Sequence, residues 1–402
     1  MTNRGVTSVI GLVFWLLAAK LYLDKDVGLA SAIISSVLLL SLIATMGLDY
    51  ALIRFLPNAG RDSDALVNSC LTVAGLMSIV VALVFITGIS LWSPALLFLR
   101  QDPVLIGAFI VFTVGWTLYV LVSRTFVARR RAGYSLVQGI IFNIFRLILI
   151  IVLATFFAAF GIFAAWGIAV VVAVGIATLL LLPRVQAGYR PLPVIKRDVL
   201  NEMMRFSFAN YVAILLWTAP ILILPLMVLN LLGAESNAYF YIAWSIANIL
   251  FSVPIAISLS LFTEGSHDEE RLGRDTRRSL RLILLVIVPS VLLILLLGDK
   301  LLFLFDPAYA ENATTLLWVL AFSAVPLSLN HIYFGVKRVQ MRMKSVIGLT
   351  AFMAVATLVL SGILLPRMGI LGAGIAWLSA QSAVALVIIM LWLPHIRMYS
   401  SR

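Results

Sequence analysis

The segment QGIIFNIFRLILI, residues 138–150, is apolar except for a few polar side chains and one charge, that of Arg146. The apolar run around it extends over about residues 134–158, so Arg146 would lie near the middle of a membrane-spanning helix. An arginine at the centre of a bilayer costs at least about 2.5–3.5 kcal/mol, so it should face water, protein or an anionic ligand. Asn143 and Gly139 share its helical face. We therefore predict that this face lines a polar cavity.

The whole chain has the composition of a membrane protein. Hydrophobic residues make up 63% of the 402 and charged residues 11%, against about 25% charged in soluble domains. Apolar runs recur that are long enough to cross about 30 Å of hydrocarbon as helices, which excludes the short alternating strands of a β-barrel. We predict an all-α integral membrane protein with twelve spans, at about 5–23, 28–50, 66–90, 104–127, 134–158, 162–182, 206–231, 237–262, 280–304, 312–334, 345–365 and 371–393.

The connections between these spans alternate in charge. Of the 29 lysines and arginines, 23 fall in connections on one side of the predicted membrane. Lysine and arginine gather on the cytoplasmic side of membrane proteins, so this pattern predicts a multi-pass protein of the cytoplasmic membrane with both termini in the cytoplasm. The same bias accounts for the net charge of +12 without nucleic acid binding.

The chain also contains an internal repeat. The segment GIFAA at 161–165 corresponds to GILGA at 369–373, an offset of about 208 residues, and each half has six spans. An even number of spans gives both halves the same orientation, so we predict two six-helix lobes related by a pseudo-two-fold axis along the membrane normal. The predicted boundaries are 1–190 for the N-terminal lobe, 191–205 for a cytoplasmic linker acting as a hinge, and 206–402 for the C-terminal lobe. Such lobes suit alternating access.

Proline distinguishes the seventh span, which contains Pro220 and Pro225 in its interior. Each proline removes a backbone hydrogen bond and tends to kink its helix. We hypothesise that the two residues serve gating by letting this span bend during transport; static kinks filled by packing are the alternative.

Motifs for catalysis are lacking in the sequence. It has no Gly-rich phosphate loop, and its three histidines lie far apart without the spacing of metal ligands. We therefore predict that the protein is not an enzyme and uses neither a cofactor nor a bound metal.

Polar and cationic residues inside the spans suggest the lining of a cavity. Tyr241 and Asn248 belong to one polar stripe of the eighth span, although such residues also connect helices to one another. Guanidinium groups bind phosphate well, whereas the carboxylates nearest the membrane, such as Asp49, lie close to span ends. We expect an anionic ligand, although cations at span ends also extend to lipid headgroups. The predicted cavity residues are Arg146, Asn143, Arg54, Arg124, Lys20, Asn248 and Tyr241.

Four short segments carry a resemblance to a known family. They are DVGLA at 26–30, GLDYALIRF at 47–55, LFDPAYA at 304–310 and MGILGAG at 368–374. In this order, and with twelve spans, the chain resembles the polysaccharide biosynthesis, or oligosaccharide flippase (Wzx-type), family of the multidrug/oligosaccharidyl-lipid/polysaccharide (MOP) exporter superfamily.

The resemblance implies a MATE-like pair of lobes around a cationic cavity, and the translocation of polyprenyl-(pyro)phosphate-linked oligosaccharide for cell-surface polysaccharide assembly. Arg146 and Arg54 match cations of the family. The resemblance further implies coupling to H⁺ or Na⁺, contact with membrane lipids and contact with glycan polymerase machinery. Relatives often have an acidic residue in the seventh span, whereas residues 219–224 contain none.

Two alternatives to the flippase stay open. The first is a multidrug or small-molecule exporter of the same superfamily, which a buried cation and few buried acids make less suitable for cationic drugs. The second is a membrane-embedded glycan polymerase or ligase, which the short outer loops disfavour.

Overall fold

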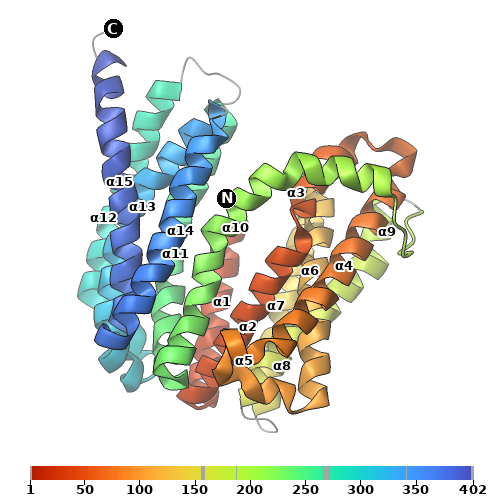
Figure 1. Ribbon diagram of the computed structural model, residues 1–402, viewed down its shortest axis with the longest axis horizontal. Coiled ribbons are helices and arrows are strands. Elements are labelled where there is room, and N and C mark those ends of the chain that lie inside the picture. Colours follow the sequence, from red (N-terminus) through yellow and green to blue (C-terminus); the bar gives the residue numbers. More distant parts are fainter. Residues whose placement is uncertain (1, 155–158, 187, 266–271, 341, 400–402) are drawn as a thin grey trace. The chain divides into compact units, whose positions relative to one another are not determined.

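A computed structural model describes residues 2–154, 159–186, 188–265, 272–340 and 342–399, and throughout these ranges the regular structure is helical (Figure 1). The α-helices are α1 Thr2–Leu21, α2 Asp24–Thr45, α3 Leu48–Phe55, α4 Ser63–Thr87, α5 Ile89–Trp92, α6 Pro103–Ala128, α7 Ala132–Ala154, α8 Ala159–Ile176, α9 Leu182–Val185, α10 Arg197–Leu232, α11 Ala234–Gly265, α12 Leu272–Phe303, α13 Pro307–Val339, α14 Met343–Met368 and α15 Ile370–Tyr399. Short 3₁₀ turns at Leu56–Asn58 (η1), Gly60–Asp62 (η2) and Pro94–Arg100 (η3) and a π-helical turn at Ala177–Leu181 (η4) connect or extend them.

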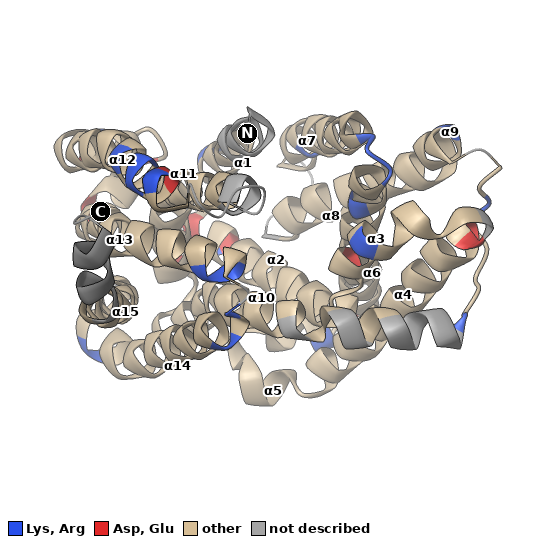
Figure 2. Ribbon diagram, turned by 90° about the horizontal axis from the view of Figure 1, so that it is seen from above, with Lys and Arg blue, Asp and Glu red and all other residues tan. Residues whose placement is uncertain are grey.

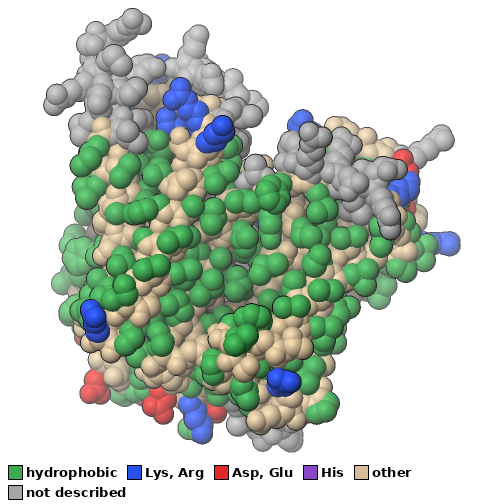
Figure 3. All heavy atoms as spheres, viewed as in Figure 1, with side chains coloured by type: hydrophobic (Ala, Val, Ile, Leu, Met, Phe, Trp, Pro, Cys, Tyr) green, Lys and Arg blue, Asp and Glu red, His purple; other side chains and the backbone are tan. Residues whose placement is uncertain are grey.

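The long helices confirm the predicted all-helical membrane fold. Within the described ranges, eleven helical segments are long and apolar enough to span a bilayer, and α1 adds a further apolar stretch, Ile10–Leu21. Hydrophobic side chains cover much of the face seen in Figure 3, and charged side chains are few there. Most of the ribbon likewise carries neither Lys or Arg nor Asp or Glu (Figure 2). This distribution is the one a bilayer requires, because a charge in hydrocarbon is costly.

Two of the spans begin with the same local signal. Asp102 accepts a hydrogen bond from the Val104 backbone N–H at 2.8 Å, and Asp306 accepts one from Ala308 at 3.1 Å. In both cases a proline follows the aspartate at the first helical position, where its missing N–H is not needed. The dipeptide Asp–Pro therefore fixes where α6 and α13 start.

Contacts between the helices divide the chain into two compact units. One unit is Leu21–Ala234, which contains α2 to α10; the other consists of Met1–Lys20 and Glu235–Arg402, which contribute α1 and α11 to α15. The prediction placed α1 in the N-terminal lobe, 1–190, and most of α10 in the C-terminal lobe, 206–402. In the structure α1 groups with α11 to α15, and α10 groups with α2 to α9. The structure therefore differs from the prediction in the membership of these two helices, whereas the repeat relation between the halves stays a prediction.

The packing of α10 explains its membership. A Cβ built on Gly47, just before α3, would lie 2.8 Å from the Cβ of Tyr211 on α10. The backbone at Gly47 therefore lies closer to α10 than any residue with a side chain could. Near the other end of α10, the amide of Asn230 donates to Ser93 Oγ at 3.2 Å and accepts from the Ala95 N–H at 3.1 Å. The middle and the C-terminal end of the helix thus contact residues within Leu21–Ala234.

The segment predicted as a flexible linker is partly helical and partly hydrogen-bonded to α4. Helix α10 starts at Arg197, within the predicted linker 191–205. Before it, the Tyr189 hydroxyl donates to Asn68 Oδ1 at 2.6 Å, the Asn68 amide donates to the Arg190 carbonyl at 2.8 Å, and the Lys196 N–H donates to Ser69 Oγ at 3.0 Å. Buried bonds of this kind hold a segment in place, so the hinge role of this segment stays a prediction.

The second predicted span, 28–50, is interrupted. α2 ends at Thr45, and Met46 and Gly47 follow with φ angles of 47° and 80°, in the left-handed region. A left-handed residue ends an α-helix because the following carbonyls and amides no longer align with the preceding turn. The chain then restarts as α3, and this break determines the geometry of the site.

Candidate functional site

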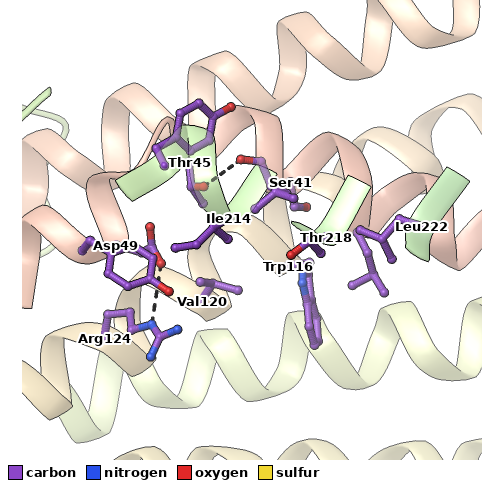
Figure 4. Close-up of a pocket in the computed structure, with 13 residues that line it drawn as sticks. Ser41, Thr45, Asp49, Trp116, Val120, Arg124, Ile214, Thr218 and Leu222 are labelled. Carbon is purple, nitrogen blue, oxygen red and sulfur yellow. Dashed lines mark hydrogen bonds and ion pairs between the residues drawn. The ribbon is translucent and has the colours of Figure 1, made fainter. Parts of the chain in front are cut away.

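A pocket of about 270 Å³ lies among α2, α3, α6 and α10 of the unit Leu21–Ala234 (Figure 4). We call it the Arg124 pocket. Its lining combines polar, aromatic and apolar side chains, namely Leu38, Ser41, Leu42, Thr45, Asp49, Tyr50, Trp116, Val120, Arg124, Tyr211, Ile214, Thr218 and Leu222. Asp49 and Arg124 lie together at one side of the pocket, with Trp116, Thr218 and Leu222 at the other.

The two charged side chains that line the pocket form an ion pair across two helices. Arg124 Nε, from α6, lies 3.7 Å from Asp49 Oδ2, from α3. The Arg124 guanidinium carbon also lies 5.6 Å from the centre of the Tyr50 ring, within the range of a cation–π contact. The Arg124 side chain is 33% exposed and that of Asp49 11%, so the cation is the more accessible partner.

The helix break at Met46–Gly47 places Asp49 where it can meet Arg124. Asp49 lies in the first turn of α3, beyond the end of the span α2, where a negative charge suits the helix N-terminus. Burial raises the pKa of the Asp49 carboxyl above its ordinary value, and the nearby charge of Arg124 opposes that rise. Arg124 is therefore the main electrostatic support for the ionised carboxylate.

The wall opposite α6 comes from α10. The Tyr211 hydroxyl donates a hydrogen bond to the carbonyl of Ile43 at 3.3 Å, close to the point where α2 ends. Thr45, in the last turn of α2, bonds the Leu42 carbonyl at 2.9 Å. Carbonyls at a helix end need such partners, so Tyr211 contributes to both the end of α2 and the pocket wall.

Arg146 lies next to an aromatic cluster that reaches the pocket. It is 7% exposed, and its guanidinium carbon is 4.8 Å from the centre of the Phe142 ring. Phe142 contacts Trp116 with ring centres 5.8 Å apart, and Trp116 stacks on Tyr119 at 5.0 Å. Trp116 lines the Arg124 pocket, whereas Arg146 does not. The cation–π contact with Phe142 is one of the interactions that stabilise this buried guanidinium.

Asn143 and Arg54, two further predicted cavity residues, lie outside the lining of the Arg124 pocket. Asn143 is buried on α7 and donates to the Gly139 carbonyl at 2.8 Å, a bond within its own helix. Arg54 is exposed on α3. Of the predicted residues in this unit, Arg124 is therefore the one that lines the pocket. Pro220 and Pro225 are buried inside the continuous helix α10.

The other predicted cavity residues belong to the second unit. Lys20 and Asn248 are exposed, on α1 and α11, and Tyr241 is half-buried with its ring 4.6 Å from that of Trp15. That unit has its own pocket of about 370 Å³ between α1, α11 and α12, and its lining is apolar except for Ser290. A polar or charged ligand would find its partners in the Arg124 pocket instead.

Asp49 is the site residue that sequence reasoning did not assign. It was recognised as a carboxylate near a span end, and Arg124 as a cation near a span end. Both ends belong to the same predicted side of the membrane, which is a signal that the two charges could meet. Tyr211 and Thr218 are polar residues of the seventh predicted span, and such residues either line a cavity or connect helices. Trp116 offered no comparable signal, because aromatic residues are frequent in spans.

Comparison with known proteins supports the fold assignment. The chain superposes on an inward-facing multidrug resistance MATE family transporter of the MOP superfamily with a TM-score of 0.73 and 13% identity, covering 98% of this chain and 96% of the other. It superposes on the lipid II flippase MurJ with a TM-score of 0.77 and 12% identity, covering 97% of this chain and 86% of MurJ. It also superposes on a MOP superfamily transporter from Pyrococcus furiosus with a TM-score of 0.63 and 14% identity, covering 98% of this chain and 93% of the other.

Sequence comparison gives a more limited result. Residues 211–363 match the MatE family model, which is less than half of the chain. A search of curated proteins found no match.

The fold is thus that of a multi-pass membrane protein of the MATE-like type, as predicted. Part of the sequence, from within α10 to within α14, carries the MatE pattern. The finer resemblance to oligosaccharide flippases stays a prediction.

Proposed function

We propose that the protein is a transporter that moves polyprenyl-(pyro)phosphate-linked oligosaccharide across the cytoplasmic membrane by alternating access, without catalysing a reaction. The observation that carries the proposal is Arg124, a partly exposed guanidinium on the wall of a pocket with aromatic neighbours. Guanidinium binds phosphate oxygens in a bidentate manner, and aromatic rings such as Trp116 suit the apolar faces of sugars.

The size of the pocket limits what it binds. About 270 Å³ is just below the usual range for ligand pockets, roughly 300–1,000 Å³. We infer that the Arg124 pocket receives the phosphate and at most the first sugar, while the rest of the glycan and the lipid tail lie elsewhere. The structural likeness to the lipid II flippase MurJ agrees with a lipid-linked substrate.

Reconstitution tests the proposal. Purified protein is placed in liposomes with a fluorescent polyprenyl-pyrophosphate oligosaccharide, and a membrane-impermeant quencher reports how fast the glycolipid changes leaflet. We expect transport above protein-free liposomes and a reduction of at least about tenfold for Arg124→Gln, corresponding to about 1.4 kcal/mol of lost binding. Arg131→Gln, which removes an exposed cation from the turn between α6 and α7, is the matched control and should leave the rate unchanged. Equal rates for wild type and Arg124→Gln would rule the proposal out.

Export of a small molecule is the second candidate. The MatE match and the carboxylate of Asp49 in the pocket favour it, because cationic drugs require an acidic partner. Cells expressing the protein would then accumulate less of a fluorescent cation, and Asp49→Asn would abolish this effect while Arg124→Gln would not.

The remaining assignments are part of the same proposal. We place both termini in the cytoplasm on the basis of the charge pattern, and keep coupling to H⁺ or Na⁺ and contact with glycan polymerase machinery as expectations of the resemblance.

A further inference from the structure

Asp49 and Arg124 are the two charged residues among those that line the Arg124 pocket. Their opposite charges cancel while Asp49 is ionised, so the pocket of the free protein has no net charge from its lining. An anionic ligand that binds Arg124 would bring a second negative charge close to Asp49. The Arg124 guanidinium would then have two anionic partners, the Asp49 carboxylate and the ligand.

The geometry shows that the pair is loosely made. The Nε to Oδ2 distance of 3.7 Å is longer than the 2.7–2.9 Å or so of a charge-assisted hydrogen bond. Arg124 is 33% exposed, on a long flexible side chain, so its guanidinium can turn toward a ligand in the pocket. The Asp49 side chain is 11% exposed at the start of a helix and has far less freedom to follow.

The groups around Asp49 offer little to replace Arg124. From α10, Tyr211 faces the pocket with a neutral hydroxyl, and from α3 itself Tyr50 does the same. At the start of α3, the backbone N–H groups of Asp49 and Tyr50 also stabilise the ionised carboxylate, but they carry no full charge. Arg54, one and a half turns along α3, is exposed. Arg124 is therefore the cation on which the ionised carboxylate depends.

A buried carboxylate that loses its cation and gains an anionic neighbour is destabilised on both counts. Proton uptake removes both penalties, since the neutral carboxyl tolerates burial and does not repel phosphate. The proton comes from water that reaches the pocket, and no other bond is made or broken.

We propose that Asp49 and a phosphate group of the ligand compete for Arg124, and that binding of the phosphate is accompanied by uptake of one proton at Asp49. The inference rests on the proposed transport of a phosphate-bearing substrate, and deepens it by linking anion occupancy to pH. Acidity favours the bound state, and loss of the proton from Asp49 restores the ion pair and expels the anion.

Binding of dibutyl phosphate to the purified protein tests this linkage. A phosphodiester has one fixed negative charge in the range of about pH 5–8, unlike a monoester with a second pKa near 6. Calorimetry in buffers of different ionisation enthalpy should show about one proton taken up per anion at the alkaline end. The dissociation constant should rise about tenfold per pH unit above the point where Asp49 ionises. Uncharged tributyl phosphate should bind without proton uptake or pH dependence.

Variants separate the roles of the two residues. Asp49→Asn, which keeps the shape of the side chain, should bind dibutyl phosphate at least about tenfold more tightly at pH 8 and without pH dependence, because the internal competitor is absent. Arg124→Gln should lose saturable binding, and Arg131→Gln should retain the wild-type pH profile.

Three outcomes would overturn the inference. They are wild-type binding that does not change with pH, Asp49→Asn binding no tighter than wild type, and the absence of anion binding at Arg124. The wild-type profile needs no variant, so poor folding of Asp49→Asn would not decide the matter. The glycolipid assay is independent: proton-linked anion binding without glycolipid transport refutes the proposed function alone, and glycolipid transport with pH-independent anion binding refutes this inference alone.

Discussion

Replacing Gly47 by alanine should destabilise the protein more than any other glycine-to-alanine change at a left-handed turn in its unit. The φ of 80° costs an L-residue about 1–2 kcal/mol. The new methyl would lie 2.8 Å from Tyr211 Cβ and 3.2 Å from Ser207 Cβ, and overpacking of this kind costs about 1–3 kcal/mol. Alanine also restricts the unfolded chain, which returns about 0.4–1 kcal/mol. The net loss of stability is therefore between about 1 and 4.6 kcal/mol.

Gly60→Ala is the matched control. Gly60 has a φ of 51°, and no heavy atom lies within 4 Å of the position its Cβ would take, so only the backbone cost of about 1 kcal/mol remains. Unfolding of both purified variants in the same mild detergent, by heat and by denaturant, gives the comparison. Since the methyl displaces Tyr211 from the pocket wall, Gly47→Ala should also transport more slowly than Gly60→Ala. Equal stability of the two variants would show that the close approach of α3 and α10 is not present in the protein.

Three more substitutions probe features described above. Met46→Val should cost about 1 kcal/mol more than Met46→Leu in the same unfolding assay, because a β-branched residue tolerates the φ of 47° poorly; equal losses would argue against the left-handed break. Tyr189→Phe should cost about 1–2 kcal/mol, by loss of the buried bond to Asn68, and should increase proteolytic cleavage within residues 188–196; unchanged cleavage would contradict a docked linker. Asn330→Leu should cost about 1–3 kcal/mol because Gln381 Oε1 loses its donor at 2.8 Å, and the double variant with Gln381→Leu should be more stable than the single one; additive losses would refute the pairing.

The spans could be predicted because each is a local property of the sequence, a run of apolar residues as long as a bilayer is thick. The interruption after Thr45 could not, because the sequence remains apolar through Leu48 and the change is confined to the torsions of Met46 and Gly47. The sequence identified Gly47 as part of the GLDYALIRF segment but did not predict its left-handed backbone conformation.

The candidate site was predicted in part. Arg124 was named, and its partner Asp49 was not, because their contact joins separate helices and no spacing along the chain reveals it. Arg146 was expected to face a polar cavity; the structure places its guanidinium beside the Phe142 ring, with which it makes a cation–π contact. Its role in ligand binding stays a prediction.

The grouping of α1 with α11 to α15 has a consequence for biosynthesis. Trp15 of α1 packs against Tyr241 of α11, a residue made more than two hundred positions later. During translation α1 is therefore inserted first, and its unit is completed only after the chain that follows α10 has been inserted. Nor does either half of the polypeptide contain a complete unit. A protein cut between Gln186 and Lys196 should yield fragments that each lack one helix of their own unit and recover a stable fold only when both are synthesised in the same cell.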